Sequence, residues 1–313
     1  IASYYNANTT TEHARLISNR VEFEISLRTI LAHLPAPKEG AGLKIADIGG
    51  GTGRYAVELA KRGHNVTLLD ISSSELSLAA QYAQTEGVQL EGIHIADASA
   101  LFTSCPSLLT QLGTFDIVLL LGPLYHLLEE EERVSAVRDA ARLLKPCFGE
   151  DRDGEEDGGG VLLASFLTTF GHLRGVARGD PGRLTSEWGW YEGYLGLGEG
   201  GEENGEEKGK YTRRKAEGVV SHHVHPSEIR GLFEKVNFSS GDINLDSSRA
   251  NEQNRNLGLQ VQKVIACESF LGAEFAASLN TLREEEWRVW MDVLARFASD
   301  ECVLGASEHL LAV

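Results

Sequence analysis

A short apolar run at Lys44–Ile48 leads into four glycines within residues 49–53 and then directly into a helical pattern at 55–62. Glycines adopt positive φ, carry no side chain and expose backbone N–H groups at the start of a helix, where an anionic group can bind. The segment therefore predicts a strand, a tight loop and a helix, with a ligand held against the loop backbone.

Short apolar runs continue to alternate with helical patterns along the chain. Such a succession is typical of βαβ units and a parallel sheet. We expect a doubly wound, mostly parallel α/β sheet with helices on both faces. The expected strands are Asn65–Asp70, 90–96, 115–121 and Val161–Leu167, and the expected helices between them are 75–85 and 133–144.

The spacing of the glycines separates two classes of nucleotide-binding loop. A dinucleotide loop follows Gly-x-Gly-x-x-Gly, but Arg54 stands at its third glycine position, where close helix packing needs glycine or alanine. NAD is therefore disfavoured. The spacing Gly49-x-Gly51-x-Gly53, preceded by Asp47, instead resembles the first motif of the Rossmann-like (class I) S-adenosylmethionine-dependent methyltransferases.

Later strand ends extend this resemblance. Asp70 ends the second strand, where a carboxylate accepts hydrogen bonds from two ribose hydroxyls. Asp97 and Ala98 follow the third strand, where the family places an acidic residue against the adenine amino group and a backbone N–H beside it. Residues 122–127, GPLYHL, resemble the motif after the fourth strand. The resemblance covers residues 43–167 and implies a Rossmann-like sheet and a cofactor site formed by Asp47, Gly49, Gly50, Gly51, Gly53, Arg54, Asp70, Ile71, Asp97, Ala98, Leu121 and Gly122.

The resemblance also implies the chemistry. Displacement at a sulfonium methyl mainly requires that the nucleophile be aligned with the carbon–sulfur bond, without a metal or a covalent intermediate. A base is needed only when the acceptor is protonated at neutral pH. His126 and its neighbour Tyr125 are the expected catalytic residues, and His126 either removes a proton or positions the acceptor. Arg54 and either Tyr4 or Tyr5 are expected near the methionine carboxylate.

The acceptor is expected over the carboxyl ends of the fourth and fifth strands, beneath residues 168–224. Four aromatic residues of that segment either wall the acceptor pocket or pack the segment onto the sheet: Trp188, Trp190, Tyr191 and Tyr194. Glu268 ends a late strand, where it either faces the acceptor or, as is usual for a solitary carboxylate, is solvated.

A cluster of His222, His223 and His225 precedes a helical pattern at 226–236. No cysteine or acid stands nearby at metal-ligand spacing, so no metal site is expected. His225 is expected to cap the helix instead.

Four segments follow from these patterns. Residues 1–40 form a helical cover with one amphipathic helix at 12–34, and 41–167 form the cofactor-binding core. Residues 168–224 form a lid inserted after the fifth strand, and 225–313 complete the sheet with strands at 261–268 and 309–313 and a helix at 282–297. Residues 150–160 and 196–209 are acidic and glycine-rich, which is typical of surface loops.

Charge and cysteine content narrow the function classes. With 29 lysines and arginines against 46 aspartates and glutamates, the net charge of −17 disfavours nucleic acid as a partner. The four cysteines form no C-x-x-C pair, which favours free thiols in a reducing, cytoplasmic setting. No apolar run approaches the roughly 18 residues of a membrane span. The chain begins with Ile1, which leaves a removed targeting segment open.

The sequence thus predicts a methyltransferase that uses S-adenosylmethionine and acts on an O or N nucleophile of a small molecule, with no nucleic acid or membrane partner. Two alternatives remain: methylation of a protein residue, and a non-catalytic binding protein that keeps the nucleotide fold. The acceptor and the oligomeric state are not determined by the sequence.

Overall fold

The structure is a computed structural model, and it describes residues 1–35, 42–147, 159–195, 212–214, 220–238 and 258–313. Seven strands of these residues form one sheet in the order β3-β2-β1-β4-β5-β9-β8. The first five pair in parallel, whereas β9 runs antiparallel to both β5 and β8. The strands are β1 Lys44–Ile48, β2 Asn65–Asp70, β3 Gly92–Ile95, β4 Ile117–Leu120, β5 Val161–Leu167, β8 Val264–Ala266 and β9 His309–Ala312.

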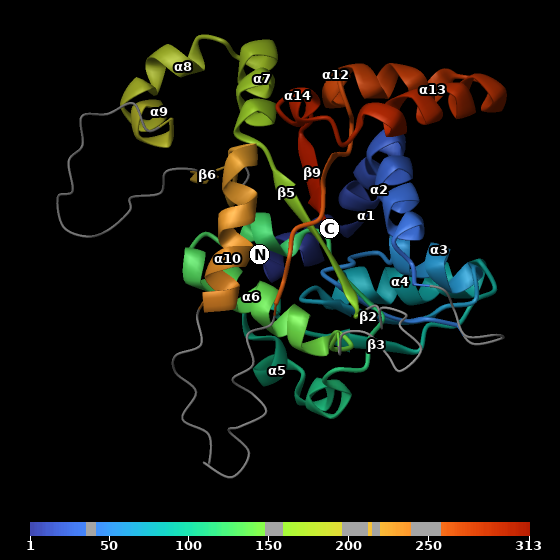
Figure 1. The fold of residues 1–313 in the computed structure, drawn as a ribbon. Helices are drawn as coiled ribbons and strands as arrows, with labels where there is room; N and C mark the ends of the chain where they lie inside the picture. The colour runs from blue at the N-terminus through green and yellow to red at the C-terminus, as the bar shows by residue number, and fades with distance from the viewer. Residues whose placement is uncertain (36–41, 148–158, 196–211, 215–219, 239–257) are drawn as a thin grey trace.

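Helices cover both faces of this sheet, which confirms the predicted fold class (Figure 1). One face packs against α6 Glu130–Leu143 and α10 Ile229–Phe238. The other packs against α2 Arg20–Ala32, α3 Arg54–Lys61, α4 Ser73–Thr85 and α13 Glu284–Phe297.

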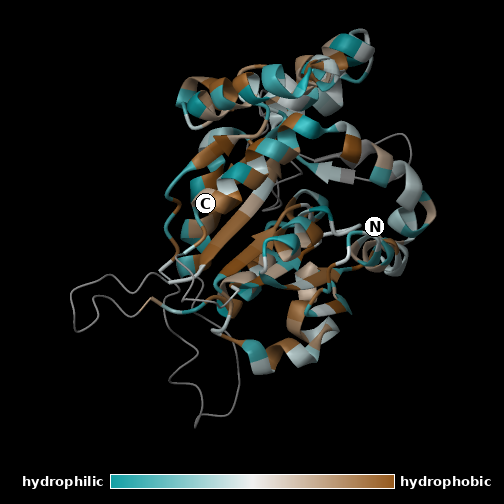
Figure 2. Ribbon diagram, turned by 90° about the vertical axis from the view of Figure 1, so that its right-hand side faces the viewer, coloured by the Kyte–Doolittle hydropathy of each residue, from teal (hydrophilic) through white to brown (hydrophobic). Residues whose placement is uncertain are grey.

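The central strands are apolar on both faces because both are buried. In β4, Val118 and Leu120 belong to the core beside α6, while Ile117 and Leu119 belong to the core beside α3. Figure 2 shows these strands in brown, between helices that also carry hydrophilic residues.

The N-terminal cover is two helices, so the prediction of one helix at 12–34 is wrong. Asn19, with φ −84° and ψ 62°, separates α1 Ala2–Ser18 from α2. Asparagine competes with the helix for backbone hydrogen bonds, which favours a break there. The break lets α1 lie on the start of α4, where Oδ1 of the Asn6 side chain accepts hydrogen bonds from the Ser72 hydroxyl at 2.8 Å and the Ser74 amide at 3.1 Å.

Several shorter elements connect these layers. They are η1 Ala98–Ala100, α5 Leu101–Ser104, η2 Pro106–Gln111, η3 Pro123–His126, α7 Thr169–Gly179, α8 Arg183–Ser186, α9 Trp188–Tyr194, β6 Thr212–Arg214, β7 Val220–His222, η4 Pro226–Glu228, α12 Gly272–Ala276, η5 Ala277–Thr281 and α14 Glu301–Leu304. The helix predicted at 226–236 is η4 followed by α10. The His225 imidazole accepts the Ser227 amide, which confirms the predicted cap.

The segment after β5 forms α7, α8 and α9, which extend beyond the sheet (Figure 1). Tyr191 and Tyr194 are buried and contact the ring of His172, whereas Trp188 and Trp190 are partly exposed, and Trp190 packs against both tyrosines.

The predicted acidic loops lie outside the described residues, except for Gly159 and Gly160. Within the described ranges, no helix combines the length and apolarity that crossing a membrane requires.

Candidate active site

A cavity lies at the carboxyl ends of β1 and β4, where the strand order reverses. Ligands of open α/β sheets bind at this position because the crossovers leave β1 and β4 in opposite directions. The cavity encloses about 1230 Å³ including its mouth. Ten predicted cofactor residues line it: Gly49, Gly50, Gly51, Arg54, Asp70, Ile71, Asp97, Ala98, Leu121 and Gly122.

The glycine loop is fixed by backbone hydrogen bonds to β2. The amides of Gly49 and Gly50 both donate to the Leu69 carbonyl, at 2.7 and 3.2 Å. Gly49 has φ +73°, and a Cβ there would lie 2.4 Å from Cγ of Pro123. The loop thus presents bare backbone to the cavity, and a side chain at Gly49 has no room.

Asp70 connects this loop to the start of α4. Its carboxylate accepts the amide of Gly51 at 2.9 Å and that of Ser72 at 2.8 Å. Burial raises the pKa of this carboxyl, while the amides of Ser72, Gly51 and Ile71 oppose the shift. The carboxylate therefore both shapes the loop and faces the cavity.

Replacing Asp70 with alanine is expected to weaken S-adenosylhomocysteine binding by roughly 10–100-fold, because it removes a charge-assisted hydrogen-bond acceptor for the ribose. Asp116→Ala is the matched control. Asp116 also accepts a backbone amide, that of Lys44 at 2.8 Å, but it lies at the amino ends of β1 and β4, away from the cavity. Calorimetric titration of both variants measures the difference. Equal S-adenosylhomocysteine affinities for the two variants would show that Asp70 does not bind the cofactor.

Asp47 and Gly53 were predicted to bind the cofactor, but neither lines the cavity. Asp47 is fully buried beneath the loop, and no described group makes a hydrogen bond of normal geometry to its carboxyl oxygens. Burial, and then the charge of Asp70, raise its pKa to about 7, with a small opposing effect of the Ala56 amide. The side chain lies against the loop backbone at Gly50 and not in the cavity.

This raised pKa predicts how stability depends on pH. The folded chain binds the Asp47 proton more tightly than the unfolded chain, so stability falls as pH rises from about 4 and levels off above about 7. Asp47→Asn removes this dependence, so the variant is expected to gain roughly 2–4 kcal/mol relative to the wild type between pH 4 and 8. Urea unfolding of the cofactor-free protein at both pH values tests this, and parallel curves for the two proteins would contradict it.

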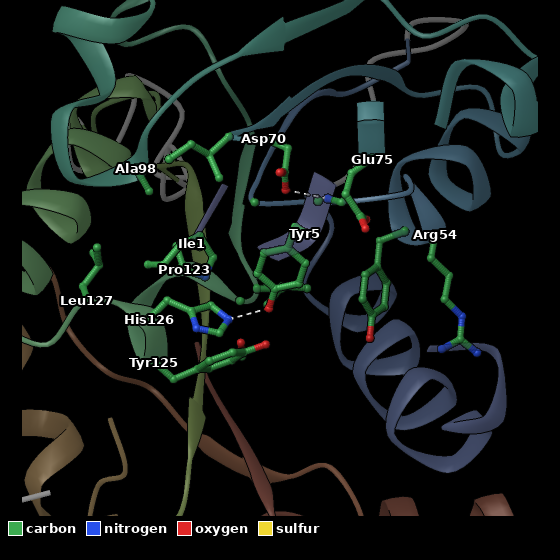
Figure 3. A pocket seen from close by; sticks show the side chains of 18 of the residues that line it. Ile1, Tyr5, Arg54, Asp70, Glu75, Ala98, Pro123, Tyr125, His126 and Leu127 are labelled. Carbon is green, nitrogen blue, oxygen red and sulfur yellow. Dashed lines mark hydrogen bonds between the residues drawn. The ribbon is translucent and has the colours of Figure 1, made fainter. Parts of the chain in front are cut away.

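The predicted catalytic residues lie on η3, beside the N-terminal helix. Figure 3 shows the Tyr5 hydroxyl directed at the His126 ring, and its oxygen lies 2.7 Å from Nε2. The rings of Tyr125 and His126 make an edge contact at 4.8 Å. Two tyrosines, Tyr4 and Tyr5, were expected near the methionine carboxylate. Of these, Tyr5 lines the cavity.

Residues on α2 and before it form the wall near Arg54. The Arg54 guanidinium stacks on Phe23 at 3.8 Å, and the Tyr55 hydroxyl donates to Glu22 at 3.0 Å. Asn19 and Glu22 line the cavity and were missed from the sequence. The helical pattern predicted burial for this segment, but it did not show which of its polar residues would face the loop.

A second cavity adjoins the first and has a volume of about 1320 Å³ including its mouth. Both are lined by Tyr5, Tyr125, His126 and His309. The second cavity continues beneath α7 and beside β7. The four aromatic residues predicted as possible walls do not line it, because the two tyrosines pack behind His172, whose ring does.

The expectation that Glu268 is solvated is wrong, because its side chain is buried and paired with His309. Its carboxylate accepts His309 Nδ1–H at 2.6 Å, the Ser307 hydroxyl at 2.5 Å and the amides of Glu308 and His309, each at 3.0 Å. Burial opposes ionisation, but the charge and hydrogen bonds of His309 outweigh it, so the pKa of Glu268 falls. Although burial also opposes the imidazolium, Glu268 raises the pKa of His309 to about 9.

The remaining histidines do not assemble a metal site. Burial, and then the charge of Arg133, lower the pKa of His222 to about 3. Within the described part of the chain, no group of three or more His, Cys, Asp or Glu residues is placed to hold an ion.

Comparison with known proteins agrees with this geometry. Residues 45–147 match the family model described as a methyltransferase domain. A ubiquinone biosynthesis O-methyltransferase of Pseudomonas aeruginosa (strain UCBPP-PA14) is 33% identical over 106 residues, 34% of this chain and 41% of that protein. A tRNA 5-carboxymethoxyuridine methyltransferase of Escherichia coli (strain K12) is 41% identical over 56 residues, 17% of this chain and 22% of that protein. The chain thus matches less than half the length of either relative.

Magnesium protoporphyrin IX methyltransferase from Synechocystis PCC 6803, with bound SAH, is 20% identical, with a TM-score of 0.45 over 76% of this chain and 88% of that one.

The reversed strand order, the glycine loop and the carboxylate at the end of β2 define a nucleotide-binding domain of the doubly wound class. Residues 45–147 of this fold match a methyltransferase-domain family model, which covers about a third of the chain.

Proposed function

We propose that this protein transfers the methyl group of S-adenosylmethionine to an oxygen or nitrogen nucleophile of a small molecule. The observation that carries the proposal is the meeting of two cavities at Tyr5, Tyr125 and His126. One cavity has the lining that the cofactor requires, and the other leaves room for an acceptor of metabolite size.

The residues present fit the cofactor. Asp70 would accept hydrogen bonds from the ribose hydroxyls, Asp97 would accept one from the adenine amino group, and the Ala98 amide would donate one to the adenine ring. Asp97 Oδ1 already accepts the Ser99 amide at 2.9 Å and its hydroxyl at 2.7 Å, which holds the carboxylate at the start of η1. The bare backbone at Gly49 leaves the methionine portion space to pass toward Arg54.

The chain's own contribution to the reaction is alignment. Bound in the first cavity, S-adenosylmethionine supplies a methyl group already activated by its sulfonium. The hydrogen bond between Tyr5 and His126 fixes both side chains, and together with Tyr125 they line both cavities. A nucleophile entering from the second cavity is thereby directed along one line, which is the main requirement of a displacement at carbon.

Small molecules are favoured over nucleic acid as acceptors. The net charge of −17 repels a polyphosphate, and the second cavity is a bounded pocket beneath α7. This also weighs against carrying the tRNA substrate of the short E. coli match over to this chain.

Release of S-adenosylhomocysteine in the presence of a metabolite library tests the proposal, with peptides and whole-protein substrates as a second arm. We expect turnover with metabolites that depends on the acceptor. Turnover only with protein substrates would overturn the substrate class, and tight cofactor binding without turnover in either arm would indicate a non-catalytic binding protein.

A further inference from the structure

The junction of the two cavities holds a buried acid–base pair that the proposed chemistry does not use. His309 begins β9 beside the end of β5, and its ring lines both cavities. Nδ1 of the ring is held by Glu268 at 2.6 Å. Among the described residues, no group bonds Nε2. One ring nitrogen, Nδ1, is therefore bonded to Glu268, and the other, Nε2, can bond a ligand at the junction.

The surroundings of His309 favour its protonated form. Glu268 is bonded to it directly, Glu22 approaches from α2, and Glu308 precedes it in the chain. These three carboxylates outweigh the burial of the ring, so its pKa is about 9. At neutral pH the Nε2–H group is a donor and has no capacity to accept a hydrogen bond.

We propose that the methyl acceptor is an acid whose carboxylate binds Nε2–H of His309 at the junction of the cavities. The proposal rests on the proposed function and names the substrate class of the same site. A charged donor forms its strongest hydrogen bond with a charged acceptor, about twice as strong as a neutral pair. Bound there, the carboxylate fixes one end of the acceptor beside Tyr5 and His126.

The rest of the second cavity is consistent with a planar acid. Arg178 and Arg183 line it as well, and Arg183 is paired with Glu187 at 3.0 Å, so Arg178 adds the main positive charge. His172 and His223 stack with ring centroids 4.9 Å apart, and burial followed by the charge of Arg183 lowers the pKa of His172 to about 4. The stacked rings offer an aromatic surface, while the charged His309 offers the anion contact.

Three carboxylates also line this cavity, so a cationic acceptor is the competing case: Asp180, Glu274 and Glu308. Glu274 is paired with Arg174 at 3.6 Å, which reduces its attraction for a second cation.

Benzoate, benzyl alcohol and benzylamine are matched probes for these cases. Each is titrated into protein saturated with S-adenosylhomocysteine and labelled at histidine, and the ring resonances are followed by NMR. Benzoate is expected to shift the His309 resonances and to bind at least about tenfold more tightly than benzyl alcohol. His309→Gln is expected to lower benzoate affinity about tenfold or more, whereas His94→Gln, on the edge strand β3, should leave it within about twofold.

The Glu268→Gln variant tests the same contact while His309 itself is kept. It lowers the charge on His309, so benzoate affinity is expected to fall about three- to tenfold while benzyl alcohol affinity stays constant. A purely structural pair would change both affinities equally.

Stronger binding of benzylamine, or equal binding of all three probes, would overturn the proposal. So would a His309→Gln variant that loses S-adenosylhomocysteine affinity and keeps benzoate affinity, because His309 would then serve the cofactor. Cofactor affinity is measured separately in the same samples, so a wild-type protein that fails to bind S-adenosylhomocysteine refutes the proposed function instead.

Discussion

A single methyl group at Gly49 is expected to reduce S-adenosylhomocysteine affinity by roughly 100-fold or more. In Gly49→Ala the new Cβ would lie 2.4 Å from the Pro123 ring, and the residue keeps a backbone with φ +73° that disfavours side chains. Neither the proline ring nor the loop yields easily, because the Gly49 amide is bonded to Leu69 at 2.7 Å. The loop is therefore expected to shift into the cavity it lines.

Gly63→Ala separates this effect from backbone strain. Gly63 has φ +85°, but a Cβ there meets nothing within 4 Å, and the residue lies outside the cavity. Gly63→Ala is expected to lose about 1–2 kcal/mol of stability from its positive φ alone and to keep cofactor affinity within about twofold, whereas Gly49→Ala is expected to lose more stability because of the added contact with Pro123. Calorimetric titration and urea unfolding of both proteins provide the comparison. Similar affinities for the two would show that the loop does not hold the cofactor.

The second large effect is expected at the Tyr5–His126 pair. His126→Ala should lower kcat by roughly 10²–10⁴-fold while S-adenosylhomocysteine affinity stays within a few-fold. The 2.7 Å contact commits Nε2 of His126 to the Tyr5 hydroxyl, so we expect His126 to act by positioning. His126→Asn, whose amide still forms a hydrogen bond, should retain much of the rate.

The two residues are expected to act as one unit. Tyr5→Phe should resemble His126→Ala in kcat, and the double variant should be no slower than either single variant. Steady-state rates with an acceptor identified from the library measure the cycle. If His126→Asn is as slow as His126→Ala while binding both substrates normally, His126 is a general base.

The glycine loop and the carboxylate of Asp70 were predictable because local sequence determines them. A parallel sheet brings the carboxyl ends of its strands to one edge, so residues that follow different strands converge there without further information. Asp97, Gly122 and His126 reach the cavity for this reason. Asp47 does not line the cavity, because its buried carboxyl lies beneath the loop at Gly50, and its motif position does not reveal this.

The rest of the cavity wall depends on contacts between distant parts of the chain. Glu22 faces the cavity only because Asn19 separates α1 from α2 and sets the second helix beside α3. Glu268 looked like a solvated strand end, yet the return of the chain through β9 buries it against His309. Asn19 favours the break but does not show which element the second helix packs against, and the pairing of β9 with β5 has no local sequence signal.

Equilibrium titration of the purified protein with S-adenosylmethionine and, separately, with NADH tests the central claim most directly. We predict saturable binding of S-adenosylmethionine at one site per chain, weakened by Asp70→Ala and largely lost in Gly49→Ala, with no saturable binding of NADH. Tight binding of NADH together with no response to S-adenosylmethionine would contradict the account.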